Sequence, residues 1–289
     1  TAFSYVWDDH DSGGNNVNRR GSAVRAARQA YEEFVPHYPL ANPSNGAPIY
    51  HSFSVGRVKF IVTDLRSDKD DQRKKDDANK TMMGAAQKEW FKQELLAAKG
   101  KYPLICWVSS VPWIGTWSSN YYPRLTNAFG FIHHTNKAVM RERRSGRPPT
   151  YPGDEDHWSV FSTERREIAD FIKSNHIQGV FILHGDAHML AADDGSHSDY
   201  ATGGGVPLPV IAAAPLDQNP SIKGGPYSQG TYYVRDREGE GAFGLATITD
   251  TGKEIRVRFS GRNNKDEEKI SLEFKVPVTR EALWYGKKG

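Results

Sequence analysis

Short apolar runs and longer amphipathic segments alternate along the first two thirds of the chain. Runs rich in β-branched and aromatic residues, bounded by Gly, Pro or charge, predict buried strands at 59–65, 104–110 and 180–183. Segments with apolar residues at helical spacing predict helices at 21–35, 84–99 and 162–175. Strands that alternate with helices indicate an α/β sheet with helices packed on its faces.

Beyond Gly203 the pattern changes to strands alone. Apolar runs and alternating segments predict strands at 206–214, 243–249, 254–259 and 270–276. Turn sequences separate the last three, which predicts an antiparallel meander at the C-terminal end. No Pro/Gly-rich linker sets this part off. We therefore expect one domain over 1–289, in which the strands of 203–278 form a second sheet packed on the first.

Acidic and imidazole groups follow an apolar segment near the start of the chain. The segment 3–7 predicts a strand that ends in Asp8, Asp9, His10 and Asp11. In α/β proteins the carboxyl edge of the strands is where ligands bind. Crowded carboxylates repel one another and are stable as anions when a cation lies among them. The pattern favours a cation at this edge, although Asp-Asp after a strand is also typical of a turn or a helix cap.

A second strand end carries the same mixture of groups. The predicted strand 180–183 runs into His184, Gly185, Asp186, Ala187 and His188. Asp186 and His188 are two residues apart, so both side chains can point into one cleft. A mixed oxygen and nitrogen ligand set without thiolates suits Ca, Mn, Fe or Zn, which leaves the metal open. The competing interpretation is that each histidine is an ordinary core or surface group.

Composition narrows the classes of protein. The chain has 289 residues, and its 38 Lys and Arg against 35 Asp and Glu leave a net charge of +3. This surplus is too small to indicate a nucleic-acid partner, and the short basic run Arg141–Arg144 does not change that expectation. No apolar stretch approaches the ~18 residues of a membrane span. The single cysteine, Cys106, excludes an intrachain disulfide and a thiolate metal cage.

The residues now carry a resemblance to a known family. Trp7-Asp8-Asp9-His10-Asp11, with Asn15-Asn16 after it, resembles the W-D-D-H-[DE] block of PhoD-like alkaline phosphatases, within the calcineurin-like metallophosphoesterases. Further segments are similar to family blocks in the same order: Phe60–Arg66, Gly84–Phe91, Ser109–Trp113, Trp158 with Glu164-Arg165, and Gly185–His188. The agreement runs from about Phe3 to the strand at Phe243. Each block alone is weak, but six in order make a specific signal.

The resemblance implies a four-layer αββα sandwich with mixed sheets and a metal cluster at the strand ends. It implies hydrolysis of phosphate esters, as an alkaline phosphatase or phosphodiesterase, by a metal-activated water. Asp9, Asp186 and His188 carry over as metal ligands, with Asn15 as a further oxygen ligand. His10 carries over as the general acid or a phosphate contact. By resemblance the divalent or trivalent metals are Ca and Fe, with Mn and Zn as alternatives.

Substrate contacts are predicted beside the metal ligands. Arg66 and Asn16 are candidates to bind the phosphate ester, and Arg66 is equally typical of a structural salt bridge. Trp113 and Trp117, with the tyrosines at 121 and 122, either wall the site or pack on one another in a surface loop. The charged run 68–80 is expected to be a solvated loop.

The chain departs from the family pattern at its beginning. An early strand with a Cys or Asp ligand, and a G-D-x-x-Y block that supplies a bridging carboxylate, are missing from these residues, which begin at Thr1. Three interpretations stay open: a fragment of a longer enzyme, one piece of a nicked enzyme with an associated N-terminal fragment, or a non-catalytic structural or interaction protein on a degenerate scaffold. The family and the missing Met favour a secreted protein, extracellular or periplasmic.

Overall fold

The computed structural model describes residues 4–44, 46–115, 156–213, 216, 223–232 and 241–278. The aromatic residues predicted at 117, 121 and 122 and the basic run at 141–144 lie outside these ranges. Within them, no helix is both long and apolar enough to cross a membrane.

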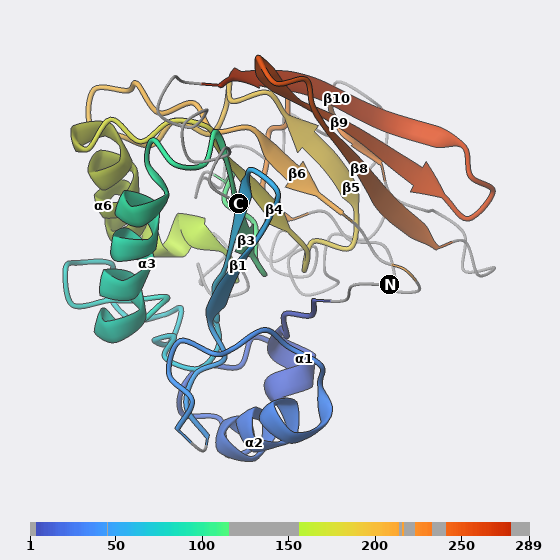
Figure 1. Cartoon of the computed structure of the whole chain (residues 1–289). Coiled ribbons are helices and arrows are strands. Elements are labelled where there is room, and N and C mark those ends of the chain that lie inside the picture. The colour runs from blue at the N-terminus through green and yellow to red at the C-terminus, as the bar shows by residue number, and fades with distance from the viewer. Residues whose placement is uncertain are drawn as a thin grey trace, which may run out of the picture.

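A seven-stranded mixed sheet forms the centre of the molecule (Figure 1). Its order is β1-β2-β3-β4-β6-β5-β7. Strands β2, β3, β4 and β6 pair in parallel, whereas β1 and β5 run antiparallel to their neighbours. The strands span His51–Val55 (β1), Val58–Val62 (β2), Leu104–Ser109 (β3), Val180–His184 (β4), Leu190–Asp193 (β5), Val210–Ala212 (β6) and Thr231–Tyr232 (β7). The carboxyl ends of four parallel strands therefore meet at one edge.

Two helices cover one face of this sheet, α3 (Ala85–Ala98) and α6 (Ser162–Ser174), as Figure 1 shows. A 3₁₀ turn, η1 (Trp158–Phe161), leads into α6. Under these helices the side chains of Trp107, Trp113 and Trp158 meet edge to face, with ring centroids 5.0 to 5.7 Å apart. Trp113 is fully buried in this core, so the prediction that it lies in a surface loop or walls the site is wrong.

The opposite face packs on a three-stranded antiparallel sheet, β8 (Ala242–Asp250), β9 (Glu254–Asn263) and β10 (Glu268–Pro277). Alternate residues of β9, such as Val257 and Phe259, are buried against Leu104, Cys106 and Phe181 of the large sheet. This confirms the C-terminal meander and its packing as a second sheet. The prediction that all strands of 203–278 belong to that sheet is wrong for 206–214, because the buried residues Val210–Ala212 pair with β4 and β5 and form β6 of the large sheet. Three of the layers of the predicted αββα class lie in the described residues: helices, large sheet and small sheet.

The N-terminal segment differs from the prediction. Residues 4–8 form no strand, and a short helix, α1 (Asp9–Ser12), follows them. The physical reason is the environment of Trp7, whose ring packs on Tyr31 and whose Nε1 donates a hydrogen bond to Asp64. Tyr31 belongs to helix α2 (Val24–Phe34), so the segment packs beside α2, away from the helices α3 and α6 (Figure 1).

The charged run 68–80 is only partly solvated. Lys69, Asp70 and Lys80 are at most 3 % exposed. Each is buried with partners: Lys69 pairs with Asp156, Asp70 pairs with Arg19, and Lys80 donates to main-chain carbonyls. A sequence pattern of mixed charge does not show which of its members have such partners, so the prediction of a solvated loop is wrong for these three.

Candidate active site

Three carboxylates from two distant parts of the chain converge at the carboxyl edge of the large sheet. Asp8 caps α1, Asp9 begins it, and Asp186 follows β4. One oxygen from each lies within 4.8 Å of the others. The side chain of Asp186 is 3 % exposed and that of Asp8 is 21 % exposed. Such a group of acids in a mostly buried place needs positive charge nearby.

The loop after α1 folds around the carboxylate of Asp9. Its Oδ1 accepts the backbone N–H of His10 at 2.7 Å, and its Oδ2 accepts the backbone N–H of Asn16 at 2.8 Å. Asn16 has φ 57°, a left-handed conformation that asparagine tolerates better than most residues. The turn thus fixes the direction of the Asp9 carboxylate before any ligand binds.

The segment that carries Asp8 and Asp9 is anchored to the end of β2. Asp64 accepts hydrogen bonds from Trp7 Nε1 and from the backbone N–H of Ile49, both at 2.9 Å. Gln87 of α3 in turn accepts the backbone N–H of Asp64 and donates to its carbonyl, each at 2.7 Å. Asp64 and Gln87, both part of family-like blocks, therefore position the site and lie outside the carboxylate group.

Asp186 and His188 have an unusual backbone. Both have positive φ, 59° and 51° respectively. Non-glycine residues in this conformation carry strain and occur where function constrains the chain. The backbone N–H of Gly185 donates to the carbonyl of Ser110 at 3.2 Å, which ties this loop to the end of β3.

Three cations balance the acids. Arg66 is fully buried, donates from Nε to Asp8 at 2.7 Å and from Nη1 to Asp156, which also pairs with Lys69. Lys223 places its Nζ 2.9 Å from Oδ1 of Asp186. Arg66 thus acts as the structural salt-bridge partner that the sequence left open.

The carboxylates divide into two groups by pKa. The pKa of Asp8 is raised to about 7, chiefly by burial, with Asp186 and Asp9 acting in the same direction and Arg66 opposing them. Burial also raises the pKa of Asp186, against Lys223 and Arg66. For Asp156, burial is outweighed by Arg66 and Lys69, and its pKa falls to about 2. The cations beside Asp156 outweigh the effect of its burial on the pKa, whereas those beside Asp8 and Asp186 do not.

Among the buried side-chain atoms that lack a hydrogen-bond partner in the part of the chain that the structure describes are Oδ2 of Asp186 and Nη2 of Arg66. An unpaired buried carboxylate oxygen is costly, and a cation that binds it removes the cost. Carboxylate oxygens are the ligands that hard cations prefer. The residues present therefore fit a metal ion held by Asp8, Asp9 and Asp186.

The structure brings some of the predicted residues together. Asp9 and Asp186 belong to the group of three carboxylates. His188 is partly buried and does not belong to that group. His10 and Asn15 are exposed on and after α1, and Asn15 and Asn16 line a groove described below. The ligand and substrate roles of these residues stay predictions.

Sequence reasoning missed four charged residues of the site. Asp8 stands beside Asp9 in the same block, so the doubled acid was a usable signal. Lys69, Asp156 and Lys223 lie in segments without a pattern of their own. Only the fold brings them to the carboxylates.

Comparison with known structures identifies the class first. The fold is similar to that of a protein titled "Structure of PhoD", with a TM-score of 0.58 and 18 % identity over 94 % of this chain and 53 % of that one. Purple acid phosphatase PPD1 from yellow lupin is matched with a TM-score of 0.41 and 11 % identity, over 94 % of this chain and 41 % of that one. The mixed sheet with its second antiparallel sheet is a metallophosphoesterase fold.

Sequence comparison gives the family. Residues 1–223 match the model of the PhoD-like phosphatase family, and the chain belongs to that family. Alkaline phosphatase D of Bacillus subtilis is 26 % identical over 225 residues, which are 69 % of this chain and 33 % of that protein. The chain thus spans about a third of this curated relative and about half of the PhoD structure.

Proposed function

We propose that the protein hydrolyses phosphate esters with a metal cluster bound at Asp8, Asp9 and Asp186. The observation that carries the proposal is the convergence of these carboxylates around a buried Asp186 oxygen without a partner. Membership of the PhoD-like phosphatase family supports the reaction class. His188 and Asn15 are proposed as further ligands, since both follow the same two site segments.

The metals are proposed to be Ca and Fe, with Mn and Zn as alternatives. Bound metal ions would neutralise the charge of the phosphate oxygens and lower the pKa of the attacking water. The carboxylates supply hard oxygen ligands, which suits Ca, Mn and ferric Fe best, and nitrogen from His188 would favour Fe or Zn at one position.

The protein's own side chains have separate tasks in this proposal. Arg66 has its Nε and Nη1 fixed by Asp8 and Asp156, so its remaining Nη2 is held in place to donate to a phosphate oxygen. His10 is exposed on α1 next to Asp9, where its imidazole can protonate the leaving oxygen. Such proton donation contributes a factor of about 10²–10⁴. Asn16 would contact the same phosphate from the rim.

The sharpest test compares two aspartates. Asp186→Asn removes a proposed ligand, and we expect at least a ~100-fold loss in turnover of a chromogenic phosphate ester, above the ~10–100-fold typical of outer-shell changes. Elemental analysis should find less bound metal. Asp11→Asn is the matched control, because Asp11 is exposed in the same helix as Asp9 and its hydrogen bonds, with the backbone N–H of Asp8 and the side chain of Tyr5, lie outside the carboxylate group.

Unchanged turnover and metal content in the Asp186→Asn protein contradict the proposal. One observation favours the alternative of a non-catalytic scaffold: Lys223 already supplies an internal positive charge to Asp186. That alternative predicts no stoichiometric metal in the purified protein and equal behaviour of the two variants.

Two separate proposals concern a segment outside these 289 residues and the location of the protein. We propose that an associated segment outside these 289 residues adds ligands to the site, supported by the share of its relatives that the chain spans. A location outside the cytoplasm is proposed on the family resemblance. Intact-mass measurement and N-terminal sequencing of protein from its source test the first point, and cell fractionation tests the second.

A further inference from the structure

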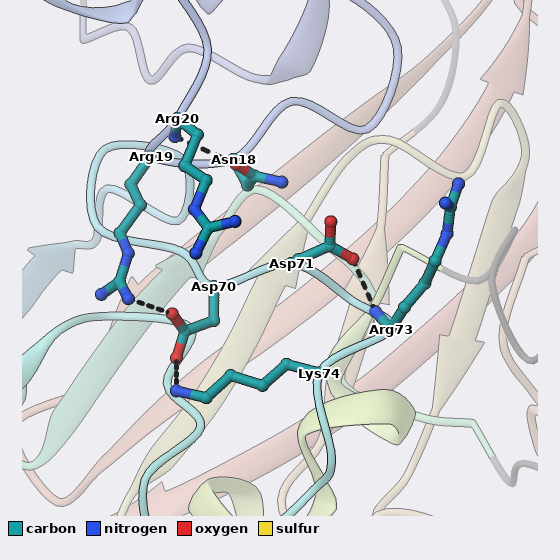
Figure 2. A pocket seen from close by; sticks show the side chains of 7 residues that line it. All are labelled: Asn18, Arg19, Arg20, Asp70, Asp71, Arg73 and Lys74. Atoms are coloured by element: carbon teal, nitrogen blue, oxygen red, sulfur yellow. Dashed lines mark hydrogen bonds and ion pairs between the residues drawn. The ribbon is translucent and has the colours of Figure 1, made fainter.

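A polar groove with an excess of positive charge lies beside the carboxylate site. Its deeper part is a pocket of about 430 Å³ between two loops, shown in Figure 2. The residues that line it are Asn18, Arg19, Arg20, Asp70, Asp71, Arg73 and Lys74. Four cations and two carboxylates leave a net charge of two positive units. A pocket of this size is large enough for a small ligand, and its lining suits an anion.

The two loops that form the pocket are braced against each other. The backbone N–H of Arg19 donates to the carbonyl of Lys69 at 3.0 Å. Asp70, which is 3 % exposed, pairs with Arg19 at 2.6 Å and with Lys74 at 2.7 Å, and Figure 2 shows both contacts. Two of the four cations are therefore used in holding the pocket together.

The other two cations have no ionic partner in the described ranges. Within these ranges Arg20 and Arg73 form hydrogen bonds only through their backbone N–H groups, which donate to Asn18 and Asp71. Both side chains are exposed, so each guanidinium keeps its full donor set for a ligand. Asp71 is the one remaining carboxylate there, so it offsets part but not all of this charge.

The groove extends to a residue that contacts the carboxylate group. An adjoining pocket of about 420 Å³ shares Asn18, Arg20, Asp71 and Arg73 with the first and extends to Asn15 and Asn16. Asn16 donates its backbone N–H to Oδ2 of Asp9. Asn16, which lines the groove, is therefore hydrogen-bonded to the carboxylate group, and Arg20 and Arg73 line both parts of the groove.

We propose that Arg20 and Arg73 bind a second phosphate group of the substrate, next to the phosphate ester at the carboxylate site. This rests on the proposed function and narrows it to esters that carry a further phosphate. Arginine is suited to this because its planar fork matches two phosphate oxygens. The braced loops hold the pocket open beforehand, which lowers the entropic cost of binding.

The test measures binding without turnover. Isothermal titration of the metal-loaded protein compares propylphosphonate with alkane bisphosphonates of increasing chain length, whose P–C bonds are not hydrolysed. We expect one bisphosphonate to bind about tenfold more tightly than the monophosphonate, the order expected for one further charge-assisted contact. The double variant R20Q/R73Q should lose this preference and keep the affinity for propylphosphonate.

Lys253→Gln is the control, because it removes one exposed positive charge in the β8–β9 turn, outside the groove. Its preference should equal that of the unaltered protein. The proposal is wrong if the unaltered protein binds no bisphosphonate more tightly than propylphosphonate. It is also wrong if the preference persists in R20Q/R73Q. Turnover of a chromogenic ester is measured in parallel. If turnover is absent while the preference for a bisphosphonate is intact, the hydrolase proposal is wrong and the proposed anion site is retained.

Discussion

The tryptophan core and the carboxylate site are both buried, but they differ in whether their buried polar atoms have hydrogen-bond partners. Each indole N–H of the core has an acceptor: Trp107 donates to Thr63, Trp113 to the carbonyl of Ser198 and Trp158 to Ser109, at 3.1 to 3.2 Å. In the site, Oδ2 of Asp186 and Nη2 of Arg66 are buried without a partner among the described residues.

This difference indicates what each region contributes. A core in which every indole N–H is paired keeps most of the free energy gained by burying large aromatic rings. A site with unpaired charge gives up stability, and natural proteins keep such a feature where a ligand completes it. Substitutions in the two regions should therefore change the free energy of unfolding in opposite directions.

The largest effect is expected in the core. Trp107→Ala removes a fully buried ring that contacts Phe91, Trp113 and Trp158, and it should lower the free energy of unfolding by about 3–5 kcal/mol. Urea denaturation followed by circular dichroism measures this. Trp107→Phe keeps a ring and should lose clearly less. A loss below about 1 kcal/mol in the Ala variant would show that the site and the core do not differ in this way.

A smaller effect of opposite sign is expected at the site. In protein freed of metal by a chelator, Asp186→Asn replaces a buried carboxylate, whose Oδ2 has no partner among the described residues, with a neutral amide of the same shape. The free energy of unfolding should rise by about 1 kcal/mol, the order of one unsatisfied buried group. Lys223, which is 24 % exposed, can then turn toward water. A clear loss of stability in the same denaturation experiment would make the Asp186–Lys223 pair a stabilising feature and break the comparison.

Most of the scaffold could be predicted because its signals are local. The strands β2, β3 and β4, the helices α2, α3 and α6 and the C-terminal meander follow from periodicity and turn residues within a residue or a few of their ends. The strands β1, β5 and β7 were missed. They span only two to five residues, and their pairing depends on neighbours far along the chain.

The family-like blocks contain residues that hold the scaffold together as well as residues of the candidate site. Glu164 accepts hydrogen bonds from Thr81 and Met82, and Arg165 donates to the carbonyls of Trp113 and Gly115. Both hold the loops that lead to the core. Motif agreement therefore pointed to the two segments, at Asp9 and at Asp186, that the fold brings together, but it did not separate positioning residues from the carboxylate group. The pairing of Lys223 with Asp186 could not be predicted from the sequence, because 37 residues and several elements separate the two.

The smallest effect tests whether an unpaired buried atom by itself marks a site. His51 of β1 is 1 % exposed. Its Nδ1 donates a hydrogen bond to the carbonyl of Ile49, and its buried Nε2 has no partner among the described residues. An imidazole Nδ1 facing a carbonyl must be the donor, so the neutral ring has an unprotonated Nε2.

Burial lowers the pKa of His51, and nearby His37 adds to this, while the hydrogen bond to Ile49 opposes it. Above the ordinary histidine pKa of about 6.5 the ring is neutral in both folded and unfolded chains and has no effect on the pH dependence. As the pH falls below that value, the unfolded chain binds a proton that the folded chain does not, so the free energy of unfolding falls until the folded pKa is passed.

His51→Asn should therefore flatten the decrease in unfolding free energy on acidification, measured by urea denaturation at a series of pH values. His176→Asn, at an exposed turn, is the control and should leave the slope unchanged. Turnover and metal content should be unaffected by either change. If His51→Asn abolished turnover while the protein stayed folded, the unpaired atom of β1 would belong to the functional machinery. The comparison between core and site would then have to count His51 as part of the site.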